Sequence, residues 1–99
     1  MIQKQEILNY LKSHQEYYYN QFGIKFIGLF GSYAREEANE KSDIDILYRI
    51  DKDKKLSIFQ YLKLNKQLED FFRTKIDLVR DETLKPQLRQ YIRKDITYV

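Results

Sequence analysis

The stretch from Asp43 to Ile50 constrains the fold more than any other part of the sequence, because it begins with a clean alternation of polar and apolar residues. Successive side chains of a β-strand point to opposite faces, so the alternation predicts a strand with one face in water. A second run, Ile24 to Phe30, is rich in β-forming residues and ends at Gly31-Ser32, which predicts a tight turn into a helix over 33–39. We expect the two strands to pair.

Helical periodicity predicts three further helices, and a third strand runs from Lys75 to Arg80. The first helix covers 4–21 and ends at Gly23, a long helix follows the charged turn 51–55, and the last one begins near Thr83. Pro86 is tolerated in its first turn. The apolar residues expected to face the core are Ile7, Leu8, Leu11, Tyr18 and Phe22, then Ile58, Phe59, Leu62, Leu64, Leu68, Phe71 and Phe72, and finally Leu84, Leu88, Tyr91 and Ile92.

These elements predict a small α+β (mixed α/β) fold, with a short mixed sheet of about three strands covered by helices. The long helix between the second and third strands permits a parallel crossover. A chain of 99 residues fits one compact domain, 1–99. Cysteine is absent, and no apolar run approaches the roughly 20 residues that span a bilayer, so we expect a cytoplasmic protein with no membrane partner.

The charge is modest, with 18 basic and 15 acidic residues giving a net charge of +3. The basic surplus lies in residues 51–99. This field suits an anionic ligand such as a nucleoside triphosphate, or an acidic protein partner, and it is too diffuse to indicate direct binding of nucleic acid.

Three aspartates are the candidate metal ligands. Asp43 and Asp45 stand two residues apart at the start of a strand, so both project from one face, and Asp77 interrupts an otherwise apolar strand. If the two strands lie side by side, three carboxylates cluster, and such like charges are costly unless a cation neutralises them. Mg²⁺ is a hard cation that oxygen ligands bind, and two ions would serve such a site.

The Gly31-Ser32 turn is the candidate phosphate site. Glycine lets the backbone approach a ligand closely, and the start of the following helix offers N–H groups to an anion. Ser32 could instead simply cap that helix. Metal-binding carboxylates beside a phosphate-binding turn indicate phosphoryl or nucleotidyl transfer.

Three other features favour structural roles. The pair in Asp51-Lys52-Asp53 lies in a lysine-rich turn and is expected to be solvated. His14 is expected at the surface, and the Tyr17–Tyr19 run is expected to pack in part, with one or two exposed rings.

The spacing Gly31-Ser32, ten residues, Asp43-Ile44-Asp45 is similar to the Gly-Ser-x10-Asp-x-Asp signature of the DNA polymerase β-like nucleotidyltransferases. The string from Gly28 to Arg35 resembles the minimal nucleotidyltransferase (MNT) domains, and the likeness covers essentially the whole chain. The resemblance implies that Asp43, Asp45 and Asp77 bind Mg²⁺ and carry catalysis. It further implies that Gly31 and Ser32 hold the triphosphate of ATP, and that Arg35 reaches a phosphate or supports the site through a carboxylate.

Proteins of this kind are often antitoxins whose partner is a HEPN ribonuclease toxin. The resemblance therefore implies transfer of AMP from ATP to a tyrosine of that toxin, which silences it. Two alternatives stay open: an antitoxin that acts by binding and occlusion alone, and a catalytic subunit that modifies a small molecule.

Overall fold

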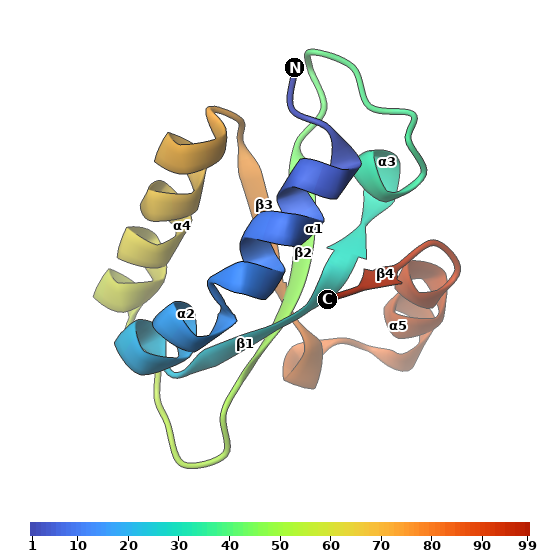
Figure 1. The fold of residues 1–99 in the computed structure, drawn as a ribbon. Helices are drawn as coiled ribbons and strands as arrows, with labels where there is room; N and C mark the ends of the chain where they lie inside the picture. Colours follow the sequence, from blue (N-terminus) through green and yellow to red (C-terminus); the bar gives the residue numbers. More distant parts are fainter.

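The computed structural model describes all residues 1–99 and contains one four-stranded sheet in the order β3-β2-β1-β4 (Figure 1). Its strands are β1 (Ile24–Phe30), β2 (Ile44–Ile50), β3 (Ile76–Arg80) and β4 (Thr97–Tyr98). β1 pairs antiparallel with β2 and β4, and β2 pairs parallel with β3. The predicted α+β fold with a mixed sheet is confirmed. Of the four strands, β4 was not predicted, because its two residues are too few to give a periodic signal.

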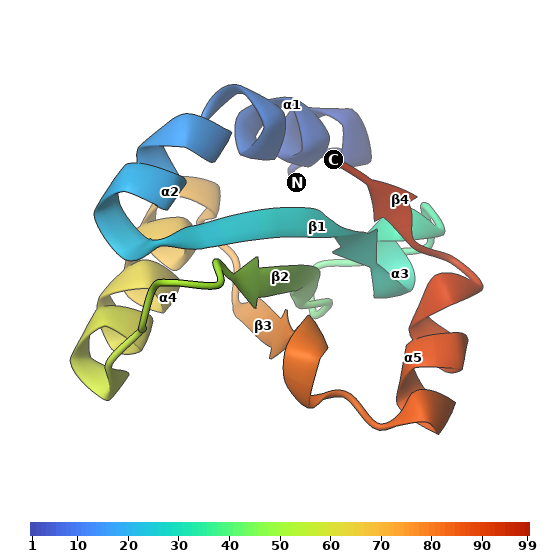
Figure 2. The ribbon, with the colours of Figure 1, turned by 90° about the horizontal axis from the view of Figure 1, so that it is seen from below.

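Three helices cover one face of the sheet, and a fourth lies toward the other face (Figure 2). The first three are α1 (Lys4–Ser13), α2 (Gln15–Phe22) and α4 (Ile58–Phe72), and the fourth is α5 (Pro86–Arg93). Their main buried cluster joins α1, α2 and α4 to the sheet. None of the helices combines the length and the hydrophobicity needed to cross a bilayer.

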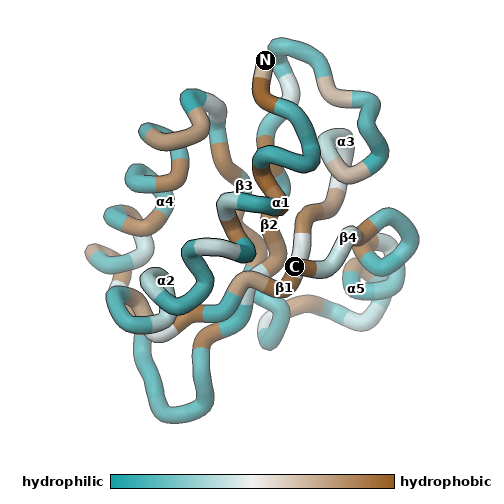
Figure 3. Tube along the Cα trace, viewed as in Figure 1, coloured by the Kyte–Doolittle hydropathy of each residue, from teal (hydrophilic) through white to brown (hydrophobic).

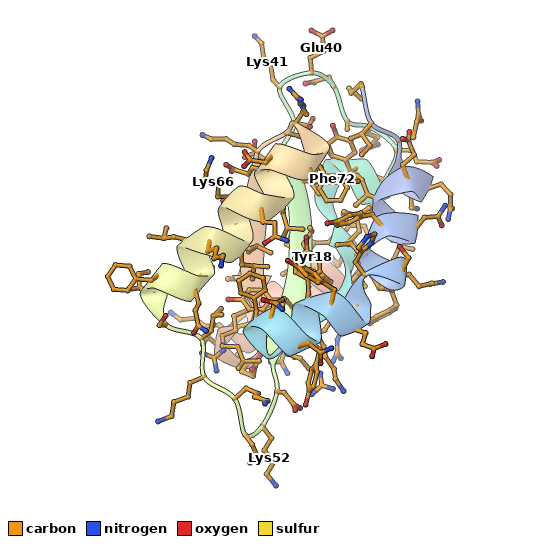
Figure 4. All side chains as sticks on the ribbon, turned by 60° about the vertical axis from the view of Figure 1, so that its left-hand side comes forward. Tyr18, Glu40, Lys41, Lys52, Lys66 and Phe72 are labelled. Carbon is orange, nitrogen blue, oxygen red and sulfur yellow. The ribbon has the colours of Figure 1, made fainter.

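Side chains that alternate along β2 and β3 place the core on one face of the sheet. Ile44 and Ile46 of β2, and Ile76 and Leu78 of β3, are buried in the core cluster. In Figure 4, Tyr18 and Phe72 point into the interior between the helices, whereas the labelled lysines point into solvent. The residues between the buried positions of β2 and β3 therefore face the opposite side of the sheet.

The predicted helix over 4–21 is wrong in one respect, because the chain breaks at His14 into α1 and α2. The backbone of His14 has φ −107° and ψ 12°, outside helical geometry. The break redirects α2, and the apolar residues predicted to be buried on both helices are buried. Neither glycine nor proline marks the break, so the sequence carries no signal for it. Gly23 ends α2 in the left-handed conformation, as predicted.

The Gln15 side chain completes the backbone hydrogen bonding of β1. Its Oε1 accepts a hydrogen bond from the Phe26 N–H at 2.8 Å, and its Nε2 donates one to the Phe26 carbonyl at 3.0 Å. The pairing of β1 with β2 shifts register just after Phe26, and β4 reaches only Gly28 and Leu29. Gln15 thus satisfies groups that no neighbouring strand reaches.

The Gln15→Ala variant is expected to lose about 1–3 kcal/mol of unfolding free energy, because it leaves two partly buried backbone groups without partners. For a chain of this size, each kcal/mol lowers Tm by about 4–8 °C. The control is Gln5→Ala, which removes an exposed hydrogen bond to Asn9. Equal losses in thermal unfolding of the two variants would contradict the role given to Gln15.

Helix α4 is only half buried. It begins with a capping box between Ser57 and Gln60 and ends at Arg73, and it makes the predicted crossover between the parallel strands β2 and β3. Its buried residues are Leu64, Leu68 and Phe72. The prediction that the other apolar residues of α4 face the core is wrong, since Phe59 is 79%, Ile58 64%, Leu62 56% and Phe71 56% exposed. Figure 3 shows hydrophobic colour along α4 out to its first turn.

Two shorter helices also differ from prediction. Helix α3 (Gly31–Ala34) is a single turn, and the helix expected over 33–39 does not form because Glu36 adopts a positive φ of 59°. The segment after β3 forms a 3-10 turn, Asp81–Thr83, before α5 begins at Pro86. Of the residues predicted to face inward there, Ile92 is buried, Leu84 is partly buried, and Leu88 and Tyr91 are exposed.

Candidate active site

Asp45 and Asp77 are direct neighbours across the parallel pair of strands β2 and β3. Both lie on the sheet face opposite the main core, because they alternate with buried isoleucine and leucine residues. Asp45 is partly buried and Asp77 is exposed. The condition set by the sequence, that the strand with Asp77 lies beside the strand with Asp45, is therefore met.

Gly31 lies against the Asp45 carboxylate. The residue before it, Phe30, pairs with Asp45 across β1 and β2, so the turn after β1 reaches the same point of the sheet. Gly31 has a φ of +77°, in the region that favours glycine. A Cβ atom at this position would collide with Oδ2 of Asp45 and would stand 2.9 Å from its Cγ. The glycine is thus required both by the turn and by the carboxylate beside it.

The negative charges around Asp45 are not balanced. Burial raises the pKa of Asp45 to about 6, and the charge of Asp77, a hydrogen bond with Asp77 and the charge of Asp43 act in the same direction. The positive charge of Arg35 opposes them. A bound cation would offset the repulsion between these carboxylates and would stabilise the ionised form of Asp45.

Asp43 occupies the residue just before β2 and is exposed. No three carboxylate or imidazole side chains of the chain are grouped closely enough to form a metal cage. The structure thus joins Asp45 to Asp77 and leaves Asp43 outside a three-carboxylate group. An all-oxygen donor set with uncompensated charge still fits a hard divalent cation, so the metal-binding role of the three aspartates stays a prediction.

Ser32 is the second residue of α3 and does not cap it. The N-cap position belongs to Phe30, and no side chain bonds to the free end of the helix. Lys4 instead contacts the other end of α3, donating a hydrogen bond from Nζ to the Ala34 carbonyl at 2.8 Å. The phosphate-binding role of Gly31 and Ser32 stays a prediction.

Arg35 ends α3 and contacts two carboxylates. Its Nε donates to Oε1 of Glu37 at 2.8 Å, and its Nη1 donates to Oδ2 of Asp95 at 2.6 Å. Both contacts are with carboxylates, and the role of Arg35 in the site stays a prediction. Sequence reasoning missed Asp95, because it lies 60 residues further along the chain and belongs to no motif.

Residues with predicted structural roles behave largely as expected. His14 is exposed and stacks on Tyr10, and Tyr18 is buried, with its hydroxyl 2.6 Å from that of Tyr10. The prediction that Asp51 is merely solvated is wrong. Asp51 accepts a hydrogen bond from the Tyr19 hydroxyl at 2.7 Å, and this bond lowers the pKa of Asp51. Asp53 in the same turn is exposed.

Comparisons with known proteins agree with the geometry. Residues 5–98 match the family model described as "Polymerase beta, Nucleotidyltransferase". The protein adenylyltransferase MntA of Thermococcus cleftensis is 34% identical over 99 residues, which cover 100% of this chain and 98% of that protein.

Two solved complexes share the fold. A toxin–antitoxin structure with AMP-PNP matches with a TM-score of 0.68 at 23% identity, over 98% of this chain and 72% of that chain. A complex of a tri-AMPylated Shewanella oneidensis HEPN toxin with an MNT antitoxin gives a TM-score of 0.59 at 21% identity, over 96% and 66% of the two chains. The sheet, the paired aspartates and the family match lead to one conclusion: the chain belongs to the polymerase β-type nucleotidyltransferase family.

Proposed function

We propose that this chain is a Mg²⁺-dependent protein adenylyltransferase that transfers AMP from ATP to a tyrosine hydroxyl of a partner HEPN ribonuclease toxin and so neutralises it. The observation that carries the proposal is the Asp45–Asp77 pair beside Gly31, with its unbalanced negative charge. The relative named as a protein adenylyltransferase supports the reaction class. The complexes with AMP-PNP and with an AMPylated HEPN toxin support the donor and the partner.

In the proposed reaction the acceptor oxygen forms a bond to the α-phosphorus of ATP, the bond to pyrophosphate breaks, and the hydroxyl proton leaves the acceptor. Asp43, Asp45 and Asp77 would hold Mg²⁺, which would neutralise charge on the phosphates. Asp77, exposed on the open sheet face, would accept the hydroxyl proton. Gly31 lets the backbone lie against Asp45 and Ser32 follows it, so the triphosphate would be held beside the carboxylates.

Binding without chemistry is the second candidate, and the exposed apolar residues of α4 favour it. Ile58, Phe59 and Leu62 occupy the first two turns of that helix and are mostly exposed. Exposed large apolar side chains gathered in this way mark surfaces that other proteins cover. An antitoxin could therefore silence a toxin by covering it, without transfer of AMP.

The test is the intact mass of the chain and of a co-expressed HEPN toxin after incubation with ATP and Mg²⁺. Mass steps of one AMP on the toxin, absent with the Asp43→Asn, Asp45→Asn double variant, are the expected result. Unchanged masses together with a stable complex would establish the binding antitoxin instead. Transfer to a metabolite, with no modified protein, would establish the small-molecule enzyme.

A further inference from the structure

The two carboxylates that contact Arg35 are not equivalent. The Glu37 side chain is 64% exposed, whereas that of Asp95 is 19% exposed, and its bond to Arg35 is the shorter one. Ion pairs at exposed positions are weak and easily screened, while a partly buried, charge-assisted hydrogen bond holds its geometry better. Asp95 is therefore the partner that fixes the guanidinium group of Arg35.

Asp95 is itself anchored to the strand that leads to Gly31. It lies between α5 and β4, and its N–H donates to the Ile92 carbonyl at 3.3 Å. Two residues further on, Thr97 pairs with Leu29 of β1, and the Val99 N–H donates to the Ile27 carbonyl at 2.9 Å. The pairing of the residues after Asp95 thus holds the end of this segment against β1.

Arg35 lies one helical turn after Gly31, because its N–H donates to the Gly31 carbonyl at 3.1 Å, and Gly31 lies against the Asp45 carboxylate. An arginine side chain carries five N–H donors, and only two of those of Arg35 have partners in the structure. The remaining donors are available to phosphate oxygens, which arginine binds with defined geometry.

We propose that Asp95 is a positioning residue for nucleotide binding: it holds the guanidinium of Arg35, one helical turn from the Gly31–Asp45 contact, so that the unused donors bind a phosphate of the nucleotide. The inference rests on the proposed function, because it needs ATP as the ligand. It makes the segment after α5 a part of the nucleotide site.

The test is equilibrium binding of ATP to the purified chain in the presence of Mg²⁺, by titration calorimetry. Asp95→Asn is expected to weaken ATP binding about tenfold, because it removes a charge-assisted bond and frees the guanidinium. The matched control is Glu37→Gln, which removes the exposed partner of the same arginine and should weaken binding less than about twofold. Asp95→Glu keeps the charge and should recover part of the affinity.

A double-mutant cycle separates positioning from simple stabilisation. If Asp95 acts through Arg35, Asp95→Asn causes no further loss of ATP affinity in an Arg35→Ala background. Additive losses in the cycle, or unchanged affinity of a folded Asp95→Asn variant, would overturn the inference and leave the proposed function standing. Absence of ATP binding by the unaltered chain would overturn both, and thermal unfolding of each variant identifies any that fail to fold.

Discussion

The Gly31→Ala variant is expected to lose AMP transfer by a factor of about 100 or more while remaining folded. Alanine at a φ of +77° costs about 1–3 kcal/mol of backbone strain. Its Cβ would also collide with the Asp45 carboxylate and displace it, and a displacement of about 1 Å in an active site can cost 100-fold in rate. Intact-mass measurement of transfer, together with thermal unfolding, would check both effects.

Gly23→Ala is a matched control for this variant. Gly23 also has a left-handed backbone, with φ +68°, so alanine there introduces a similar strain. The new Cβ would stand 2.7 Å from Cβ of Lys54, so the exposed turn that carries Lys54 has to shift, but it would touch no residue of the candidate site. We expect Gly23→Ala to lose stability and to keep transfer. If both variants keep transfer, or lose it equally, the contact between Gly31 and Asp45 has no role in the reaction.

The Asp45→Asn variant is expected to lose transfer by about 1000-fold or more, and yet to be more stable than the unaltered protein when metal is removed. The loss follows from the several kcal/mol that a bound metal supplies to such a reaction. The gain in stability follows from the pKa of Asp45, which is about 6 in the folded protein against 3.8 for an ordinary aspartate, because the folded state disfavours the ionised carboxylate. Allowing for solvent screening of a partly exposed group, deleting the charge should add about 1–2 kcal/mol at pH 7.5.

The sign of this effect depends on pH. A raised carboxyl pKa means that the folded state binds more protons than the unfolded state, so the charge of Asp45 destabilises the fold progressively as pH rises from about 4 to about 6. In EDTA, the difference in Tm between Asp45→Asn and the unaltered chain should be small at pH 4 and fully developed at pH 7.5. Added Mg²⁺ should raise the Tm of the unaltered chain and leave that of the variant unchanged.

Asp53→Asn is the control for Asp45→Asn, because Asp53 is exposed in the turn before α4, beyond the opposite end of β2 from Asp45. It should change neither transfer nor Tm. A destabilised Asp45→Asn protein in EDTA would show that the carboxylate stabilises the fold, contrary to the charge balance described for it.

The parts of the fold with strong local signals could be predicted from the sequence. The alternation in β2 and the apolar run of β1 predict two paired strands, and the length of α4 permits the parallel crossover that the structure shows between β2 and β3. The break at His14 could not be predicted, because it follows from how α2 and Gln15 meet β1. Such contacts between distant elements produce no periodic pattern of apolar residues from which a break could be predicted.

The candidate site shows the same division. The motif predicts which aspartates and which glycine belong to it, because their spacing in the chain is short. Asp95 could not be found, because its meeting with Arg35 depends on α5 and β4 returning the chain to β1. The apolar stripe of α4 predicts more buried residues than the structure shows. Periodicity identifies the apolar residues of a helix, but it does not show which of them pack against another element.

The exposed residues of α4 and the carboxylate pair lie on opposite sides of the sheet, because α4 packs on the core face and Asp45 and Asp77 project from the other. A protein that bound Ile58, Phe59 and Leu62 would therefore contact a different face of the molecule from the one that carries Asp45 and Asp77. Binding of a protein at α4 and transfer of AMP at the carboxylate pair would then use separate surfaces, and a substitution in one surface would leave the other intact.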